Sequence, residues 1–169
     1  MWLLIAAGLV FLVGFVAFTG APYVPSRRAD IQRVFTELYP LSAKDLVVDI
    51  GSGDGVVLRT VSKLGARAVG YEIHPILVLI SRMLSRGDGK VRVKLANFWR
   101  APLPDETTAV YTFGEARDIA KMYARVQQEA TRLRRPLTFI SYAFNIPGIT
   151  PDASDKSYFL YVVKPLQES

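Results

Sequence analysis

The feature that most constrains this chain is a run of alternate glycines placed directly after an apolar stretch. Leu46-Val47-Val48 leads into Asp49-Ile50-Gly51-Ser52-Gly53-Asp54-Gly55, and a second apolar run, Val56-Val57-Leu58, follows at once. This is the pattern of a buried strand, a tight turn and the start of a helix. Glycines in such a turn let a ligand approach the backbone, because a Cβ atom would clash. The pattern predicts an α/β fold with a ligand site where this strand ends.

A carboxylate at the end of the next apolar segment indicates the kind of ligand. Ala68-Val69-Gly70-Tyr71 predicts a second strand, and it ends in Glu72, 17 residues beyond Gly55. Parallel strands present their carboxyl ends at one edge of a sheet, and an acid there can accept hydrogen bonds from both hydroxyls of a ribose. We therefore expect an adenosine-containing cofactor with Glu72 as its ribose acceptor.

The spacing of the glycines separates the candidate cofactors. The loop reads G-x-G-x-G, whereas the dinucleotide fingerprint G-x-G-x-x-G would place its third glycine at the position of Val56. Asp49 and Asp54 would also set carboxylates near a pyrophosphate, which binds best at a helix end free of them. A cofactor with a cationic sulfonium and an amino group suits this acidic loop, which favours S-adenosylmethionine. A nicotinamide or flavin site, or a glycine turn in an unrelated α/β protein, is the alternative.

The amino-terminal segment has the composition of a membrane span. Residues 1–26 carry no charged side chain, and most of them are apolar. Eighteen such residues in a helix cover roughly 27 Å, close to the hydrocarbon thickness of a bilayer. Two arginines follow and none precedes, which places the rest of the chain on the cytoplasmic or matrix side. We predict a single-pass transmembrane anchor over residues 1–20 and a linker over 21–26. A cleaved secretory signal is the alternative, although its basic n-region is missing.

Composition limits what the remaining residues 27–169 can be. Their number suits one compact domain. The absence of cysteine excludes disulfides and thiolate metal sites, and a single histidine argues against a histidine-built metal centre, so we expect no metal. The formal charge of +6 lies outside the anchor and suits anionic lipid headgroups without requiring nucleic acid as a partner. The basic run at Arg132, Arg134 and Arg135 indicates a solvated helix end or, alternatively, a lipid contact.

Strand patterns alternate with helix patterns along this domain. Strands are predicted at 46–50, 68–72, 91–96, 108–113, 137–142 and 158–163, helices at 27–39, 56–64, 75–85 and 116–133, and a loop at 145–156. The predicted fold is therefore α/β and Rossmann-like. It is a doubly wound, mostly parallel sheet of six or seven strands with helices on both faces, preceded by one transmembrane helix.

The order of these elements, the glycine loop and Glu72 together resemble the class I, seven-strand S-adenosylmethionine-dependent methyltransferases. Within that class the chain is most similar to the small membrane-anchored protein-lysine methyltransferases, whose members modify the ATP synthase c subunit and the adenine nucleotide translocase. Three further segments carry the resemblance, namely Pro22-Tyr23-Val24-Pro25, Val69-Gly70-Tyr71-Glu72 and Phe144-Asn145-Ile146-Pro147-Gly148. Two segments depart from the relatives: His74-Pro75 replaces an Asn-Pro, and Gly114-Glu115 replaces a Pro-Glu.

The loop chemistry and the resemblance together define a candidate cofactor site. Its members are Asp49, Gly51, Ser52, Gly53, Gly55, Glu72, Asn97 and Phe98. Asp49 is expected to order the loop and to face the cofactor's amino group, or else simply to cap a turn. The resemblance implies that Asn97 bonds the edge of the adenine and that Phe98 covers its face. The alternative for this pair is a polar turn beside a core aromatic.

Candidate catalytic residues follow from the chemistry of methyl transfer to an amine. The protein has to align donor and acceptor and to receive the lysine in its neutral form. Glu115, after the fourth predicted strand, is expected to hold the amine, with a surface carboxylate at the start of the next helix as the equal alternative. Tyr23, Tyr142 and Phe144 are expected to wall a channel for the lysine stem, unless they are core aromatics.

These features predict a membrane-anchored, S-adenosylmethionine-dependent methyltransferase that modifies a lysine of a membrane protein near the bilayer surface. Confinement to one leaflet would raise the effective concentration of such an acceptor. A methyltransferase of a small or lipid-like acceptor is the first alternative. A membrane-tethered binding module without turnover is the second.

Overall fold

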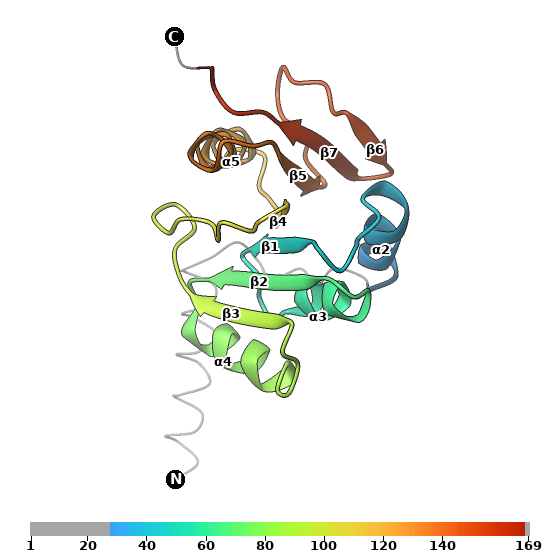
Figure 1. Cartoon of the computed structure of the whole chain (residues 1–169), viewed down its shortest axis with the longest axis vertical. Helices are drawn as coiled ribbons and strands as arrows, with labels where there is room; N and C mark the ends of the chain where they lie inside the picture. Colours follow the sequence, from blue (N-terminus) through green and yellow to red (C-terminus); the bar gives the residue numbers. More distant parts are fainter. Residues whose placement is uncertain (1–27, 168–169) are drawn as a thin grey trace, which may run out of the picture.

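Residues 28–167, which the computed structural model describes, form a seven-stranded mixed sheet with helices packed on its two faces (Figure 1). The strands are β1 (Leu46–Ile50), β2 (Arg67–Glu72), β3 (Val91–Leu95), β4 (Ala109–Phe113), β5 (Leu137–Tyr142), β6 (Ala153–Asp155) and β7 (Tyr158–Val163). The helices are α2 (Arg28–Arg33), the π-helix η1 (Val34–Leu38), α3 (Val56–Lys63), α4 (Pro75–Leu84) and α5 (Ile119–Leu133). The predicted α/β class and its helices on both faces are confirmed.

The strand order explains where a ligand can bind. It runs β3-β2-β1-β4-β5-β7-β6, with β3 to β5 parallel and β7 antiparallel to both of its neighbours. The chain moves outward from β1 to β3 and then returns to the other side of β1 with β4. The carboxyl ends of β1 and β4 therefore diverge into connections on opposite sides, which is where an open parallel sheet leaves a crevice.

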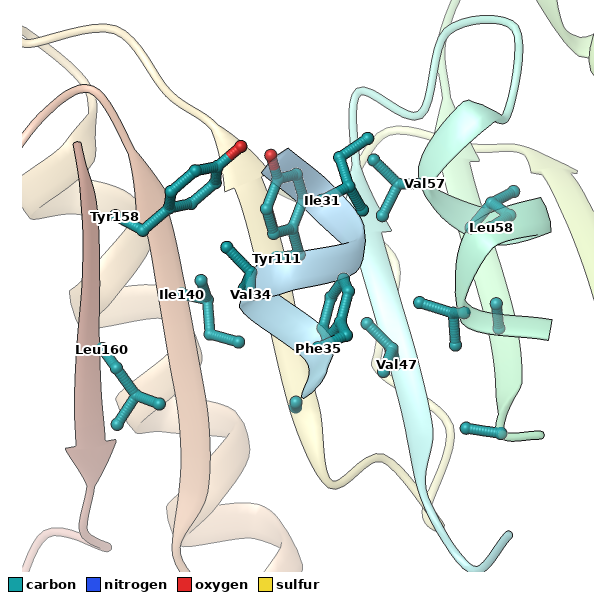
Figure 2. Close-up of a cluster of buried hydrophobic side chains, with 14 of the residues drawn as sticks. Ile31, Val34, Phe35, Val47, Val57, Leu58, Tyr111, Ile140, Tyr158 and Leu160 are labelled. Carbon is teal, nitrogen blue, oxygen red and sulfur yellow. The ribbon is translucent and has the colours of Figure 1, made fainter. Parts of the chain in front are cut away.

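One face of the sheet is covered by α2, η1, α3 and α4. Ile31, Val34 and Phe35 recur at helical spacing and are all buried, packed against Val47 of β1 and Tyr111 of β4 (Figure 2). The helix predicted over 27–39 is present, and its second half is wound as η1. The amide of Tyr39 donates to the carbonyl of Val34 at the end of η1.

The opposite face has α5 as its one helix within the described residues. The other cover on this face comes from the β3–β4 connection, residues 96–108, which buries Phe98 and Leu103 against the sheet, and from Ile146. A long connection without regular structure therefore fills the place that a crossover helix would take between these strands. Side-chain contacts with α5, described below, hold it there.

The carboxyl end holds one strand more than its sequence pattern indicated. β6 lies inside the predicted loop 145–156, so the expectation of a single strand there was wrong, and the sheet has the larger of the two predicted strand numbers. Ala153–Asp155 follows a proline and an aspartate and has no apolar alternation. It becomes a strand because the turn at Lys156 (φ +52°) folds it back along β7.

The predicted anchor over residues 1–20 and the linker over 21–26 lie outside the described residues, as does Tyr23. Within residues 28–167 no helix combines the length and the apolar character needed to cross a membrane.

Candidate functional site

The glycine loop between β1 and α3 is wound in a conformation that favours glycine. Gly51, Gly53 and Gly55 have φ values of +70°, +53° and +82°, in the left-handed region that L side chains rarely adopt. The amides of Gly51 and Ser52 both donate to the carbonyl of Tyr71, over 2.8 and 3.2 Å, and so bind the loop to the end of β2. The loop is therefore fixed by β2 before any ligand binds.

The loop glycines differ in what surrounds them. A Cβ atom on Gly51 would meet nothing within 4 Å, so the backbone there borders open space. A Cβ on Gly55 would overlap the hydroxyl of Ser81 in α4, which means that this glycine also serves helix packing. The Ser52 side chain is buried over Gly70 of β2. Gly51 is thus a glycine of this loop whose missing side chain leaves room for a ligand.

Glu72 is held rigidly at the end of β2. It is 7% exposed, one carboxylate oxygen accepts the Gly53 amide and the other accepts the His74 amide, both over 2.9 Å. A carboxylate has about four acceptor positions, so one remains on each oxygen. The two oxygens can therefore receive the two hydroxyls of a ribose without giving up their backbone contacts.

A pocket opens beside Glu72 between the ends of β1, β2 and β3. Its lining is Ile50, Gly51, Tyr71, Glu72, Ile73, Ala96, Asn97, Phe98 and Trp99. The structure thus brings together four of the predicted cofactor residues, Gly51, Glu72, Asn97 and Phe98. Phe98 is buried and Trp99 is 44% exposed, with their ring centroids 5.5 Å apart. Trp99 was missed by the sequence reasoning, although its position directly after Phe98 was a usable signal.

Asn97 has one of its side-chain groups engaged. Its Oδ1 accepts the Trp99 amide over 2.9 Å, in a local turn. The side-chain amide nitrogen remains as a hydrogen-bond donor toward a base. The polar turn, which was the alternative interpretation of Asn97, is therefore present. Asn97 lines the pocket as well.

The connection that carries Asn97, Phe98 and Trp99 is fastened to α5 by Glu129. This carboxylate is 2% exposed, accepts the amide of Leu103 over 3.0 Å, and forms ion pairs of 2.9 Å with Arg125 and Arg132. Arg132 also donates to the Leu103 carbonyl and pairs with Asp105, both within 2.8 Å.

The basic run on α5 therefore has a structural role in part. Arg135 donates to the carbonyls of Asp105 and Thr107, over 2.7 and 2.6 Å. Arg132 and Arg135 thus hold the β3–β4 connection, which the predicted solvated helix end or lipid contact did not foresee. Sequence could not reveal this role, because it depends on a buried glutamate in the preceding turn.

Asp49 supplies a second buried carboxylate beneath the loop. It is 3% exposed in β1, and its pKa is raised well above the ordinary 3.8, first by burial and then by the negative charges of Glu72 and Asp54. Among the described residues no neighbouring cation opposes this rise. Asp54 by contrast pairs with Arg59 over 3.2 Å. The base of the site is therefore short of positive charge.

These observations fit S-adenosylmethionine and disfavour a pyrophosphate. Three carboxylates around one loop match a ligand with an ammonium group and a sulfonium, whereas they would repel phosphates. Glu72 matches the ribose, Gly51 leaves space for the methionine part, and the apolar walls at Ile73 and Phe98 match an adenine. Within residues 28–167 no group of three or more His, Cys, Asp or Glu side chains is placed to hold a metal ion.

Glu115 lies just after β4, beside the carboxyl end of β1. Its carboxylate pairs with Arg117 over 3.0 Å, and its carbonyl accepts the amides of Asp118 and Ile119. The side chain is 36% exposed. This residue therefore starts the turn into α5, as the alternative interpretation held, while its carboxylate stays accessible to an incoming group.

The aromatic residues at the end of β5 and just beyond it occupy both faces of the sheet. Tyr142 stacks with Phe113 and Tyr158, with centroids 4.9 and 4.7 Å apart, on the face covered by α2 and α3. Ala143 then takes a left-handed φ of +70°, and Phe144 packs on the α5 face. Because the backbone reverses between them, these two rings do not lie on one wall. The channel that Tyr142, Phe144 and Tyr23 would form stays a prediction.

Comparison with known proteins assigns the family. Residues 49–153 match the family model of the ANTKMT methyltransferase domain. The chain belongs to this family. The match begins at Asp49 and includes the glycine loop, Glu72, the pocket lining and Glu115. S-adenosylmethionine is the cofactor of this methyltransferase domain, in agreement with the charge and shape of the loop.

Curated relatives extend the match over more of the chain. The lysine N-methyltransferase of the ATP synthase C subunit from Xenopus laevis is 31% identical over 134 residues, which cover 78% of this chain and 57% of that protein. The human protein of the same name is 29% identical and is covered to 55%. The methyltransferase chain thus spans somewhat more than half the length of these relatives.

A solved structure shares the fold. It is an RNA methyltransferase from Salinibacter ruber in complex with S-adenosyl-L-homocysteine, with a TM-score of 0.74 and 23% identity. The superposition covers 86% of this chain and 97% of that one. At this identity the likeness concerns the fold of the methyltransferase domain alone.

Proposed function

We propose that this methyltransferase modifies a lysine side chain of a membrane protein of the same type as the c subunit of ATP synthase. The names of the curated relatives support the acceptor class. The observation that carries the chemistry is the pair of buried carboxylates, Asp49 and Glu72, at the ends of adjacent strands. Together they fit a cationic methyl donor held at the carboxyl edge of the sheet.

The protein's own residues have three tasks in this reaction. When bound, S-adenosylmethionine supplies a methyl group already activated by the sulfonium charge. Glu72 and the loop fix the donor's position, and the apolar pocket wall at Phe98 excludes water from it. Glu115 accepts a hydrogen bond from the incoming amine and orients its lone pair toward the donor. The lysine ammonium must lose its proton before attack, to Glu115 or to water.

The proposal includes the position of the enzyme in the cell. Residues 1–20 would anchor the domain in the bilayer, with the catalytic part on the cytoplasmic or matrix side. The absence of charge in residues 1–26 and the arginines that follow support this topology. An anchor of this kind keeps the domain beside membrane-embedded acceptors.

The test is a transfer assay with the full chain. The purified protein is incubated with methyl-labelled S-adenosylmethionine and with membranes from a strain that lacks it, and label is counted in protein bands and in the solvent-extracted lipid. We expect a labelled protein band that maps to a lysine. Label in the lipid would establish the small-acceptor enzyme instead, and cofactor binding without label in either fraction would contradict the proposal.

Two variants make the assay specific to the site. Glu72→Gln should abolish labelling because the cofactor no longer binds, and calorimetry should show that loss directly. Glu115→Gln should retain cofactor binding and slow transfer by roughly 10²-fold or more, the usual size of a general acid–base or positioning contribution. An unchanged rate of methyl transfer in Glu115→Gln would show that this residue only forms the turn into α5.

A further inference from the structure

Helix α4 has the reverse of the usual amphipathic pattern. The buried side chains of α4 and its C-cap are Val78, Ser81 and Ser85, all at most 9% exposed. The opposite face presents Ile76, Leu79 and Met83, which are 39%, 67% and 66% exposed. Spacings of three and four residues place each trio on one side of the helix. A surface helix of a water-soluble domain normally turns its apolar side chains inward. The outer face of α4 is therefore suited to contact with apolar groups outside the protein core.

Residues close to α4 in the sequence are also apolar and exposed. Of the ten exposed large apolar side chains within the described residues, seven fall between positions 73 and 99. We call them the α4 face: Ile73, Ile76, Leu79, Met83, Leu84, Leu95 and Trp99. Figure 1 shows α4 beside β3, the strand at one edge of the sheet. Leu95 is the last residue of β3. A cluster of this kind marks an interaction surface more often than scattered exposure does.

The same part of the chain concentrates positive charge. Residues 73–103 contain Arg82, Arg86, Lys90, Arg92, Lys94 and Arg100 but a single acid, Asp88. Arg82 is engaged, because its guanidinium donates to the carbonyl of Val93 over 3.0 and 2.8 Å. Lys94 lies over the ring of Tyr71, 5.4 Å from its centroid, on the α5 side of the sheet. Arg86, Lys90, Arg92 and Arg100 are exposed. This one segment accounts for most of the formal charge of +6.

We propose that the α4 face docks on an anionic lipid bilayer. Large apolar side chains would enter the boundary between headgroups and acyl chains, and the surrounding arginines and lysines would contact the lipid phosphates. Trp99 lines the cofactor pocket together with Ile73, and its partly exposed ring is of the type that favours a membrane interface.

The positive charge favours an anionic bilayer over two other partners that could cover the α4 face. A second copy of the chain would bring two strongly basic surfaces together, which like-charge repulsion disfavours. The uncharged residues 1–26 of the same chain could cover the apolar side chains but would leave the cations without a counter-charge. An anionic bilayer complements both components at once.

Docking in this way would place the cofactor pocket at the membrane surface. Ile73 and Trp99 belong both to the α4 face and to the pocket lining. The proposal concerns where the domain lies and not what it methylates. Its test is therefore separate from the transfer assay, and either can fail alone.

The experiment uses the absence of cysteine. A single Leu79→Cys or Ala124→Cys change in the full chain can carry a nitroxide label, and Ala124 is exposed on α5, on the other face of the sheet. Both proteins are placed in phosphatidylcholine vesicles with and without phosphatidylglycerol. In the anionic vesicles we expect the label at 79 to collide severalfold more with dissolved oxygen than with a water-soluble nickel chelate. The label at 124 should remain accessible to the chelate.

Three results would overturn the proposal. The label at 79 could be as open to the chelate as that at 124 in anionic vesicles. The label at 79 could be shielded from both reagents, and to the same extent in vesicles with and without phosphatidylglycerol. That result would indicate that residues 1–26 cover the α4 face. The label could show dipolar broadening, which would indicate a second copy.

A charge variant provides the second readout. Arg86→Gln combined with Lys90→Gln should remove most of the phosphatidylglycerol dependence of the label at 79. Cofactor affinity, measured by calorimetry, should not change, because neither residue lines the pocket. Retention of the full lipid dependence in this variant would contradict the proposal.

Discussion

Asp49 and Glu72 are neighbouring buried carboxylates whose mutual repulsion lowers the stability of the folded protein. Asp49 pairs in register with Gly70, so Glu72 projects from the next strand just beyond it, and the two carboxylates repel one another in a buried setting. A cationic cofactor relieves that repulsion. We therefore expect the cofactor-free site to hold an unfavourable interaction that binding of the cation would remove.

The first prediction concerns the pH dependence caused by Asp49. Its raised pKa means that, from the ordinary value near 3.8 up to the raised one, the native state binds more protons than the unfolded state. Stability of the cofactor-free protein therefore falls as pH rises through that window. Asp49→Asn should remove this fall and make the apo protein more stable at neutral pH, as urea unfolding at several pH values would measure.

The cofactor provides the matching control. Because the bound cation favours ionised Asp49, affinity in the wild type should increase as pH rises through the same window, and the increase should be absent in Asp49→Asn. A pH-independent wild-type affinity would show that Asp49 does not face the cofactor's charge.

A second prediction compares a glycine of the cofactor loop, Gly51, with a glycine inside β2, Gly70. Gly70→Ala should cost about 1 to 3 kcal/mol of stability, because the new methyl group overlaps Ser52 and Leu58. Gly51→Ala meets open space and should cost roughly 1 kcal/mol for its left-handed φ alone. Its main effect should be a loss of cofactor affinity of tenfold or more. Calorimetry and thermal unfolding on both variants would separate the two effects.

Among the helices and strands, the sequence predicted the central parallel strands well and the elements at the edges of the sheet poorly. The bounds of β1, β5 and β7 agree with the prediction, because each is rich in apolar residues and lies between turn residues. β6 was missed because its pairing with β7, and not its own residues, makes it a strand. The outward apolar face of α4 was missed because helical spacing alone cannot show which side meets the sheet.

The candidate site divides in the same way. The glycine loop and Glu72 could be located from local spacing, since one strand–turn–helix unit contains the signal. Glu129 could not, because its role depends on how the long β3–β4 connection folds back on α5. Tyr142 and Phe144 were grouped by proximity in sequence, and the left-handed Ala143 between them turns them to opposite faces.

The third prediction tests that connection through Glu129. Glu129→Ala leaves Arg125, Arg132 and the Leu103 amide without their shared acceptor, which should cost about 2 kcal/mol of stability. It should also weaken cofactor binding about tenfold, because the pocket wall that Asn97 and Phe98 form loses its support. Glu106→Ala, an exposed acid on the same connection, is the control and should change neither quantity. Equal affinities in both variants would show that the connection holds its shape without α5.

In the tertiary structure, the hairpin of β6 and β7 lies against α2, from which it is far removed in the sequence. Arg33 of α2 donates to Asp155 of β6 over 2.7 Å, across 122 residues of sequence. This contact joins the edge that carries β6 to the helix that covers β1.

The fourth prediction measures that closure. A double-mutant cycle of Arg33→Ala and Asp155→Ala should give a coupling of about 1 kcal/mol in urea unfolding, since both side chains are partly buried. Asp30→Ala is the matched control, because Asp30 lies 3.8 Å from the same guanidinium without a close hydrogen bond, and its coupling to Arg33 should be near zero. No coupling for Asp155 would mean that the hairpin docks by its apolar side chains alone.

The strand order determines how far the reacting centre lies from the edge strand β3. Adjacent strands lie about 4.8 Å apart, and β1 and β4 are the second and third strands from β3. With α4 on the bilayer, the reacting centre would lie roughly 10 to 15 Å from β3, measured along the sheet. An acceptor lysine would have to reach that position. Moving it by one helical turn, about 5 Å, in a reconstituted acceptor should abolish its methylation, and unchanged methylation would contradict this geometry.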